Sequence, residues 1–248
     1  MSVDKTCLSY WFPKIQEAGL PVPRTKILRM TEDEQRAWFP AFDGDDIGAA
    51  AKEFADRVGN VADGIGYPCF LRTGHTSAKH SWNKSCYLRS RDRVIHHMYS
   101  IIEYSEMAGI IGMPWVVWAI REYLPIKPLG ICPYYRDMPV GREFRFFVDG
   151  SVVICWHPYW PLEALERGGA VDSVNHEELC HINKPDLNRL YSMASAAGGA
   201  VGGAWSVDMI ETERGWYLTD MAEAHKSFHW EGCEHDRKIR KGVGGEDE

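Results

Sequence analysis

Apolar residues recur at helical spacing in several parts of the chain. Residues 7–18 carry four of them on one face of a predicted helix that ends at Gly19: Leu8, Trp11, Phe12 and Ile15. Thr31 precedes an acidic stretch and is a suitable N-cap for a short second helix. The same pattern predicts further helices over residues 45–58, 91–106, 161–167 and 185–197.

Short apolar runs between these helices predict strands. They cover residues 67–73, 85–90, 115–124, 142–149, 151–159, 204–212 and 215–223. Gly150 separates one pair of runs and residues 213–215 join another, so each pair predicts an antiparallel hairpin. Alternating helices and strands followed by hairpins predict an α+β fold with two lobes.

The pattern divides the chain into three parts. Residues 1–64 predict an amino-terminal α/β lobe and residues 65–232 the main domain. Residues 233–248 are charged and glycine-rich, which is typical of a flexible tail. With 248 residues, the chain is long enough to bury a substantial core.

Charge and cysteine content narrow the classes of function. The formal net charge of −7 argues against a protein that coats nucleic acid through a broad basic surface. The seven cysteines include no Cys-x-x-Cys pair, which indicates reduced thiols and not a disulfide scaffold. The first residues lack the features of a secretion signal, and the longest apolar run is strand-sized. We therefore expect a cytoplasmic protein that does not associate with membranes.

The histidines do not follow a known metal-binding motif. Five of them lie near the predicted strands and loops: His75, His80, His157, His225 and His229. The sequence has no His-Glu-x-x-His motif and no Cys/His spacing typical of zinc. The expected role of these histidines is to hydrogen-bond a loop or face a substrate in the neutral form. A Gly-x-Ser-x-Gly motif is also absent, which argues against a serine hydrolase.

Two cations flank a loop of small residues after the first strand of the main domain. Arg72 ends the strand, and Lys79 follows seven positions later. Small residues let backbone amides approach phosphate oxygens, arginine grips phosphate with two donors, and lysine adds a mobile charge. A lid over a polyphosphate, in which Gly74 lets the loop close, is one interpretation of this segment. A surface hairpin with solvated charges is the alternative, because the segment is not a Walker A motif.

Two further strands carry charged residues beside apolar ones. The strand that ends at residues 121–124 and turns at Pro125 suits an adenine and its ribose, with Glu122 at the edge of a cleft. Glu143 and Arg145 share one face of their strand, because side chains alternate with a period of two. Solvated strand ends and a surface ion pair of little energetic value are the alternatives.

Acidic residues on the last predicted hairpin indicate a magnesium site. Asp208 lies on one strand, Asp220 on the next, and Glu223 at the exit of the second. Carboxylates that converge from neighbouring strands are the oxygen ligands that Mg²⁺ prefers. Exposed acids on a β-ribbon are the alternative interpretation.

In their order along residues 65–230, these segments together resemble the ATP-grasp superfamily. In that fold two α+β lobes hold ATP between antiparallel sheets. The sequence is most similar to two groups. One is the eukaryotic cell-cycle ATP-grasp family that assists assembly of a translation initiation factor. The other is the bacterial and phage ATP-grasp clade named for an arginine and two lysines, which implies a bacterial or phage source.

The resemblance assigns roles by position. The family pattern of two basic residues seven apart, followed by a tryptophan, fits Arg72, Lys79 and Trp82, and the segments REYLPIKP and EFRFFV fit its hinge and following strand. The positions that it assigns to ATP are Arg72, Lys79, Glu122, Tyr123, Leu124, Lys127, Glu143 and Arg145. Lys79 and Arg145 are the implied catalytic residues. The implied metal ligands are Asp208, Asp220 and Glu223, whereas Ala222 replaces the family's metal-side asparagine.

The resemblance implies an ATP- and Mg²⁺-dependent ligase. Such an enzyme activates the carboxylate of a small molecule or peptide as an acyl phosphate, which an amine or another nucleophile then attacks. One alternative is an RNA-end ligase or RNA repair enzyme. Another is a non-catalytic, ATP-binding chaperone that assembles a partner protein. Ala222 and two tryptophans expected to be exposed, Trp156 and Trp160, favour this last function.

Overall fold

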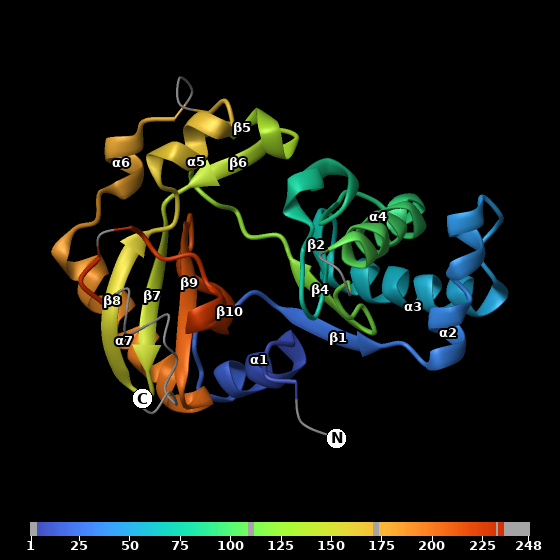
Figure 1. Cartoon of the computed structure of the whole chain (residues 1–248), viewed down its shortest axis with the longest axis horizontal. Helices are drawn as coiled ribbons and strands as arrows, with labels where there is room; N and C mark the ends of the chain where they lie inside the picture. Colours follow the sequence, from blue (N-terminus) through green and yellow to red (C-terminus); the bar gives the residue numbers. More distant parts are fainter. Residues whose placement is uncertain (1–3, 109–111, 171–173, 232, 236–248) are drawn as a thin grey trace, which may run out of the picture.

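Two four-stranded antiparallel sheets form the framework of the protein (Figure 1). The computed structural model describes residues 4–108, 112–170, 174–231 and 233–235. The first sheet has the order β1–β4–β2–β3, with strands Thr25–Arg29, Val117–Glu122, Cys69–Thr73 and Tyr87–Leu88. The second has the order β10–β9–β7–β8, with strands Gly215–Glu223, Ala204–Thr212, Glu143–Asp149 and Val152–Pro158.

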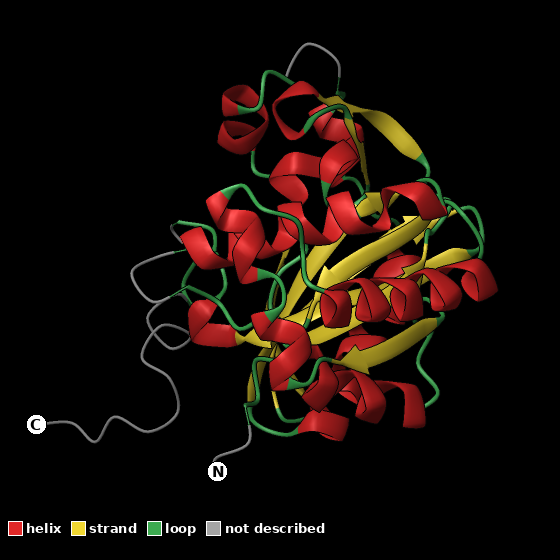
Figure 2. Ribbon diagram, turned by 90° about the vertical axis from the view of Figure 1, so that its right-hand side faces the viewer, coloured by secondary structure: helices red, strands yellow, loops and turns green. Residues whose placement is uncertain are grey.

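Helices cover each sheet and give each its own hydrophobic core. Beside the first sheet lie α2 (Glu32–Arg36), α3 (Ala49–Ile65) and α4 (Val94–Met107). Against the second sheet pack α1 (Leu8–Glu17) and α7 (Lys184–Val201). Figure 2 shows the strands running side by side beneath these helices. Apolar side chains that face the helices, such as Trp118 in the first sheet and Phe146 in the second, are fully buried.

The first 64 residues contribute to both lobes. Strand β1 pairs with β4 at the edge of the first sheet, and α3 shares the core of that sheet. Helix α1 lies instead in the core of the second sheet, where Trp11 and Phe12 are buried. The segment expected to be an amino-terminal lobe is therefore divided between the two sheets (Figure 1).

Most predicted elements are present at the expected positions. The four apolar residues of α1 are all buried on one face. Thr31 caps α2 in a capping box with Glu34, whose side chain accepts from the Thr31 backbone amide. Both predicted hairpins form, β7 with β8 and β9 with β10.

Several elements were not predicted. Strands β5 (Pro128–Cys132) and β6 (Met138–Gly141) form a separate two-stranded sheet, and α6 (His176–Cys180) is a short helix. A 3-10 helix, η2 (Lys79–Lys84), occupies part of the expected loop. The prolines at 128, 133 and 139 break the alternation that would have indicated β5 and β6.

Among the described residues, no helix combines the length and apolar character needed to span a bilayer.

Candidate functional site: a charged cleft between the two sheets

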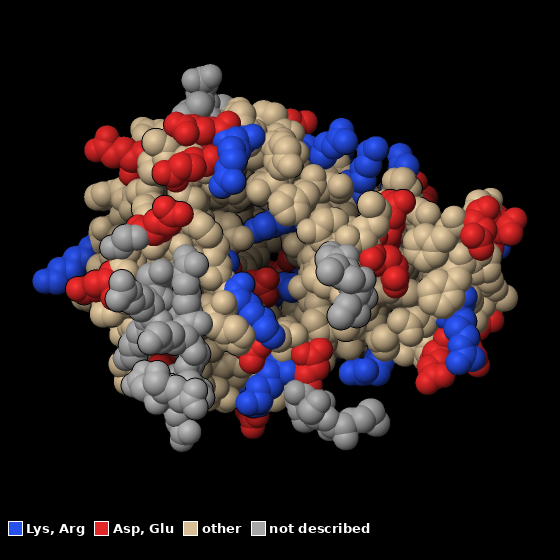
Figure 3. Space-filling view, in the orientation of Figure 1, with Lys and Arg blue, Asp and Glu red and all other residues tan. Residues whose placement is uncertain are grey.

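A cleft of about 920 Å³, counting its open mouth, lies between the two sheets. The space-filling view shows a hollow at the centre of the molecule with basic and acidic side chains in it (Figure 3). Charged residues from both sheets line this cleft: Arg72, Lys79, Arg121, Glu122, Glu143, Asp208 and Asp220.

Arg72 and Arg121 form the basic side of the cleft. They lie on neighbouring strands β2 and β4, and both side chains are buried, Arg121 to 97 % and Arg72 to 95 %. Arg72 forms an ion pair with Asp220, with Nη1 and a carboxylate oxygen 3.0 Å apart, which joins the first sheet to the second. Arg121 donates to the carbonyl of Thr219 at 2.7 Å, but its Nη2 has no hydrogen-bond partner in the described part of the chain.

The unpartnered nitrogen indicates that the cleft suits an anion. Burial, and then the charge of Arg72, lower the pKa of Arg121 to about 9. A guanidinium that burial and a like charge destabilise in this way would gain strongly from a negatively charged ligand.

Lys79 reaches the cleft from the first residue of η2. Its ammonium donates to the hydroxyl of Tyr159 at 2.6 Å and lies 4.5 Å from the centre of that ring. Burial alone would lower the pKa of Lys79, but Tyr159 and Glu143 outweigh it and raise the pKa. The lysine is therefore held in its charged form at the cleft wall.

Gly74 has a different role from the one expected from the sequence. A β-carbon at this position would lie 2.3 Å from the sulfur of Cys7 and 3.2 Å from Val117. Its backbone amide also donates to the Val117 carbonyl, and its carbonyl accepts from Leu8. Gly74 thus permits close packing against α1 and β4, and it is fixed at both backbone groups instead of free to act as a hinge.

Asp208 lines the acidic side of the cleft and is held by Arg145 in a bidentate pair. They are directly opposed on β7 and β9, and Nε and Nη2 of Arg145 donate to the two carboxylate oxygens at 2.7 and 2.8 Å. Burial opposes the charged guanidinium, but Asp208 outweighs it and raises the pKa of Arg145. The third donor, Nη1, reaches the carbonyl of Phe228 at 3.2 Å.

Asp220 lies opposite Asp208 in the pairing of β9 with β10. The two carboxylates therefore project from adjacent strands at one level, as the sequence predicts. Glu143, two residues before Arg145, faces the same cleft, and burial raises its pKa to about 7. Three carboxyl groups converge here.

Glu122 lies at the junction of the two sheets and is held by two arginines. Its carboxylate accepts from Arg24 at 2.7 Å and from Arg214 at 2.6 Å. These hydrogen bonds outweigh the effect of burial and lower the pKa of Glu122. The following residues, Tyr123 and Leu124, line the cleft, as expected for the hinge segment.

Three of the predicted site residues are not among those that line the cleft: Lys127, Arg145 and Glu223. Lys127 donates to Glu211 at 2.8 Å, and Arg142 shares the same carboxylate. Glu223 accepts from Lys226 at 2.6 Å. By strand alternation Glu223 lies on the face opposite Asp220, whereas Ala222 shares the face of Asp220.

The tryptophans expected to be exposed are not. Trp160 is buried and packs against Tyr135 and Tyr159. Trp156 is half-buried against Phe144 and Phe146 in the second core. Both are explained by packing, so they provide no exposed aromatic surface.

Sequence reasoning missed several residues of the cleft. Arg121 was overlooked although it directly precedes Glu122, and Tyr159 gave no signal because its partner Lys79 is 80 residues away. Most of the apolar wall of the cleft was also missed: Phe70, Ile126, Met138 and Ile210. These side chains come from both sheets and from the β5–β6 hairpin, so only the folded chain brings them together.

The residues of the cleft fit a magnesium-bound nucleotide. The apolar wall offers a surface for a planar base, and the buried cations Arg72, Lys79 and Arg121 match a chain of phosphates. Asp208 and Asp220 supply hard oxygen donors on the same side.

The sequence matches no family model and no curated protein. Solved structures match its fold. Cdc123 from Schizosaccharomyces pombe is 12 % identical over 88 % of this chain and 83 % of its own, with a TM-score of 0.57. An N5-carboxyaminoimidazole synthase from Aspergillus clavatus, in complex with ADP and 5-aminoimidazole ribonucleotide, is 11 % identical over 91 % of this chain and 46 % of its own, with a TM-score of 0.54.

Some similar structures are considerably longer than this protein. The chain spans 60 % of a RimK-domain ATP-grasp protein from Sphaerobacter thermophilus, which is 14 % identical over 88 % of this chain with a TM-score of 0.46. At these identities the likeness concerns the fold and not the substrate. The two α+β lobes, the antiparallel sheets and the cleft between them show that this protein has the ATP-grasp fold.

Proposed function

We propose that the protein is an ATP- and Mg²⁺-dependent ligase that activates a carboxylate as an acyl phosphate for attack by an amine or another nucleophile. The observation that carries this proposal is the cleft itself, where buried cations from the first sheet face paired carboxylates from the second. ATP would supply the phosphoryl group, and the chain supplies charge neutralisation and alignment.

Different cations in and beside the cleft would contact different phosphates of the nucleotide. Arg72 and Arg121 are buried and fixed by the strands, so they suit the phosphates that remain with the nucleotide. Lys79 and Arg145 are joined through Tyr159, whose hydroxyl accepts from Lys79 and whose ring lies 4.8 Å from the Arg145 guanidinium. These two suit the transferred phosphate, where charge develops in the transition state.

The hinge segment would hold the base. Tyr123 and Leu124 line the cleft next to Phe70 and Ile126, so an adenine placed here meets apolar side chains on its faces and backbone groups at its edge. Glu122 is already occupied by Arg24 and Arg214. We therefore assign Glu122 to shaping the hinge, with any ribose contact shared with these arginines.

Asp208 and Asp220 would hold the magnesium ion. Each carboxylate is already paired with an arginine, but each oxygen retains a lone pair that a cation can use. Glu223 is paired with Lys226 on the other face of the strand, so binding there would require that pair to open. Ala222 adds no ligand, and water and phosphate oxygens would complete the coordination sphere.

Calorimetric titration with a non-hydrolysable ATP analogue tests the proposal. We expect binding that requires Mg²⁺ in the wild type and is weakened at least about tenfold in Asp220→Asn. Glu213→Gln, an exposed acid on the turn between β9 and β10, is the matched control and should bind like the wild type. Absence of Mg²⁺-dependent binding in the wild type would exclude a nucleotide site.

A second candidate function is ATP-dependent assembly of a partner protein. It is favoured by the likeness to Cdc123, which this chain covers almost to full length, and by Ala222. Phosphate release separates the two functions. A ligase releases phosphate when its carboxylate and amine are supplied, whereas an assembly factor binds the analogue tightly without turnover in a screen of such substrates.

A further inference from the structure

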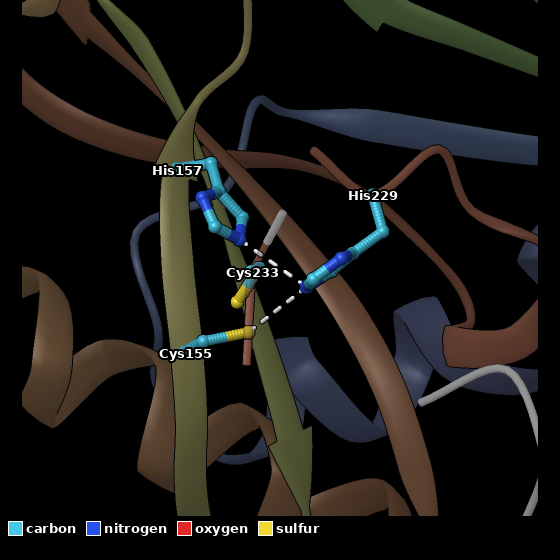
Figure 4. Close-up of side chains that lie close together, drawn as sticks. All are labelled: Cys155, His157, His229 and Cys233. Atoms are coloured by element: carbon cyan, nitrogen blue, oxygen red, sulfur yellow. Dashed lines mark hydrogen bonds between the residues drawn. The ribbon is translucent and has the colours of Figure 1, made fainter. Parts of the chain in front are cut away.

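Four metal-binding side chains gather beside the second sheet, outside the cleft. Cys155 and His157 lie on the edge strand β8, and His229 and Cys233 lie after the last strand, beyond the 3-10 helix η5 (Ala224–Lys226). One donor atom from each of the four lies within 4.8 Å of all the others. Figure 4 shows the four side chains pointing toward one another.

The donor atoms are already close to the spacing of a metal centre. Nε2 of His229 lies 3.2 Å from Nε2 of His157 and 3.2 Å from the sulfur of Cys155. Tetrahedral zinc with bonds of about 2.0 Å to nitrogen and 2.3 Å to sulfur separates its ligands by roughly 3.3–3.8 Å. The widest separation therefore needs to shorten by about an ångström, which side-chain rotation can provide.

The cluster is poorly explained as ordinary hydrogen bonding. The two imidazoles face each other through their Nε2 atoms, and such a pair can form only one hydrogen bond, because one ring must accept. A thiol is a weak donor and a weak acceptor. Four side chains whose lone pairs point at one position are stabilised more by a shared cation than by contacts with one another.

The surroundings hold these side chains in place. The ring of His229 packs edge-on against Phe147, with centroids 4.7 Å apart, and is 98 % buried. The indole of Trp230 stacks on His157 at an interplanar angle of 11°. Apolar packing of this kind fixes ligand orientation and restricts water, as it does in structural metal sites.

From these contacts we propose that Cys155, His157, His229 and Cys233 bind one zinc ion in a closed, four-coordinate structural site. Two nitrogen and two sulfur ligands in a tetrahedron favour zinc over the oxygen-seeking ions magnesium and calcium. Binding converts both thiols to thiolates and releases two protons, so the occupied site is neutral. With all four positions filled by the protein, the ion has no open position for a substrate.

The site would fasten the segment after β10 to the opposite edge of the sheet. His157 and His229 are 72 residues apart in sequence. The segment between η5 and Cys233 also carries the Phe228 carbonyl, which accepts from Arg145. Zinc would therefore stabilise both the end of the fold and the hydrogen bond that orients a cleft residue.

The first experiment uses the full chain, purified under reducing conditions and stripped of metal with a chelator. Titration with Co²⁺ should give one equivalent of a tetrahedral ion, seen as intense visible bands together with thiolate-to-cobalt charge transfer. Zn²⁺ should then displace it at one ion per chain. Failure to bind Co²⁺, or the weak spectrum of octahedral oxygen coordination, would overturn the proposal.

Variants locate the ion. Cys155→Ser and Cys233→Ser should each weaken Co²⁺ binding more than about 100-fold and remove much of the charge-transfer band. The control is Cys180→Ser, because Cys180 also contacts a histidine, His176, with sulfur and Nε2 3.4 Å apart. Equal binding by all three variants would overturn the assignment.

Two measurements keep the test decisive. Circular dichroism of the metal-free wild type and of each variant shows whether the chain is folded. Mass measurement without reductant detects a bond between Cys155 and Cys233. A folded chain that carries this disulfide and takes no metal after reduction would overturn the proposal.

Discussion

The cleft and the Cys/His cluster lie on the same sheet but use opposite kinds of chemistry. His157, Arg145, Asp208 and Asp220 are consecutive partners across strands β8, β7, β9 and β10, so one row of side chains crosses from the cluster to the cleft. At the cleft end the row is charged and already paired, Arg145 with Asp208 and Asp220 with Arg72. At the cluster end the donors are the neutral imidazole and thiol groups.

This difference indicates how each region responds to its ligand. Arg72 is paired with Asp220 and Arg145 with Asp208, so a nucleotide and its ion must exchange these partners, whereas Nη2 of Arg121 has no partner among the described residues. The cluster offers four donor atoms to a cation, one from each of its side chains. Its stabilisation therefore depends on an ion from outside, whereas the cleft is stabilised by the fold itself.

Removing one charge from the cleft should have the largest effect. Asp208→Ala leaves the partly buried guanidinium of Arg145 without its bidentate partner, so we expect the free energy of unfolding to fall by about 3 kcal/mol. Urea denaturation measures this change in the free energy of unfolding. The double variant Arg145→Met/Asp208→Ala should recover much of the loss, because no buried charge remains.

The matching change in the cluster sharpens the comparison. In metal-free protein, Cys155→Ser should lower the free energy of unfolding by at most about 1 kcal/mol, because a neutral thiol is replaced by a neutral group of similar size. If Cys155→Ser destabilised the metal-free chain as much as Asp208→Ala does, the contrast between charged and neutral regions would be wrong.

Lys79→Met should weaken binding of the ATP analogue by about 10–100-fold, since a hydrogen bond to a charged group contributes roughly 1.5–3 kcal/mol. The control is Lys84→Met, which removes an exposed lysine from the other end of the same 3-10 helix. Calorimetry compares the two variants. Equal affinities would show that Lys79 does not contact the nucleotide, and its bond to Tyr159 would then be only structural.

The cleft should also show a pH dependence through Glu143. Its pKa is raised from 4.5 to about 7 because burial disfavours the charged form. A raised pKa in the folded state contributes stability that is fully present below about pH 4.5 and is lost as pH rises through about 7. The stability of the wild type relative to Glu143→Gln should therefore be greater at pH 5 than at pH 8, as measured by denaturation without nucleotide. The opposite trend would mean that Glu143 is ionised in the folded protein.

The sequence predicts the elements well and the contacts between them less well. Helical and strand periodicity is local, so α1, β2 and the two hairpins lie where the pattern places them. The order of charged motifs also indicates a cleft. Partner choice is not local: Glu143 and Arg145 suggest a pair on one strand, yet Arg145 binds Asp208 on the neighbouring strand.

The Cys/His cluster shows the same limit more strongly. Each half has a short motif, Cys-x-His on β8 and His-x-x-x-Cys after β10, but neither half is a recognised zinc spacing. The expectation that His157 and His229 hydrogen-bond a loop or face a substrate came from reading each half alone. Only the pairing of β8 with β7, and the return of the chain after η5, brings the halves together.

The smallest effect expected is coupling between the two regions. Zinc would fix the segment that carries the Phe228 carbonyl, which accepts from Arg145. Removing zinc should therefore weaken binding of the ATP analogue by only about two- to fivefold, which is less than about 1 kcal/mol. The comparison is made by calorimetry on zinc-loaded and stripped wild type with Mg²⁺ restored, and Cys155→Ser should not respond to stripping. By linkage, the analogue should strengthen zinc binding by the same factor. An unchanged affinity would make the two regions independent, and complete loss of binding would place the essential ion in the cleft.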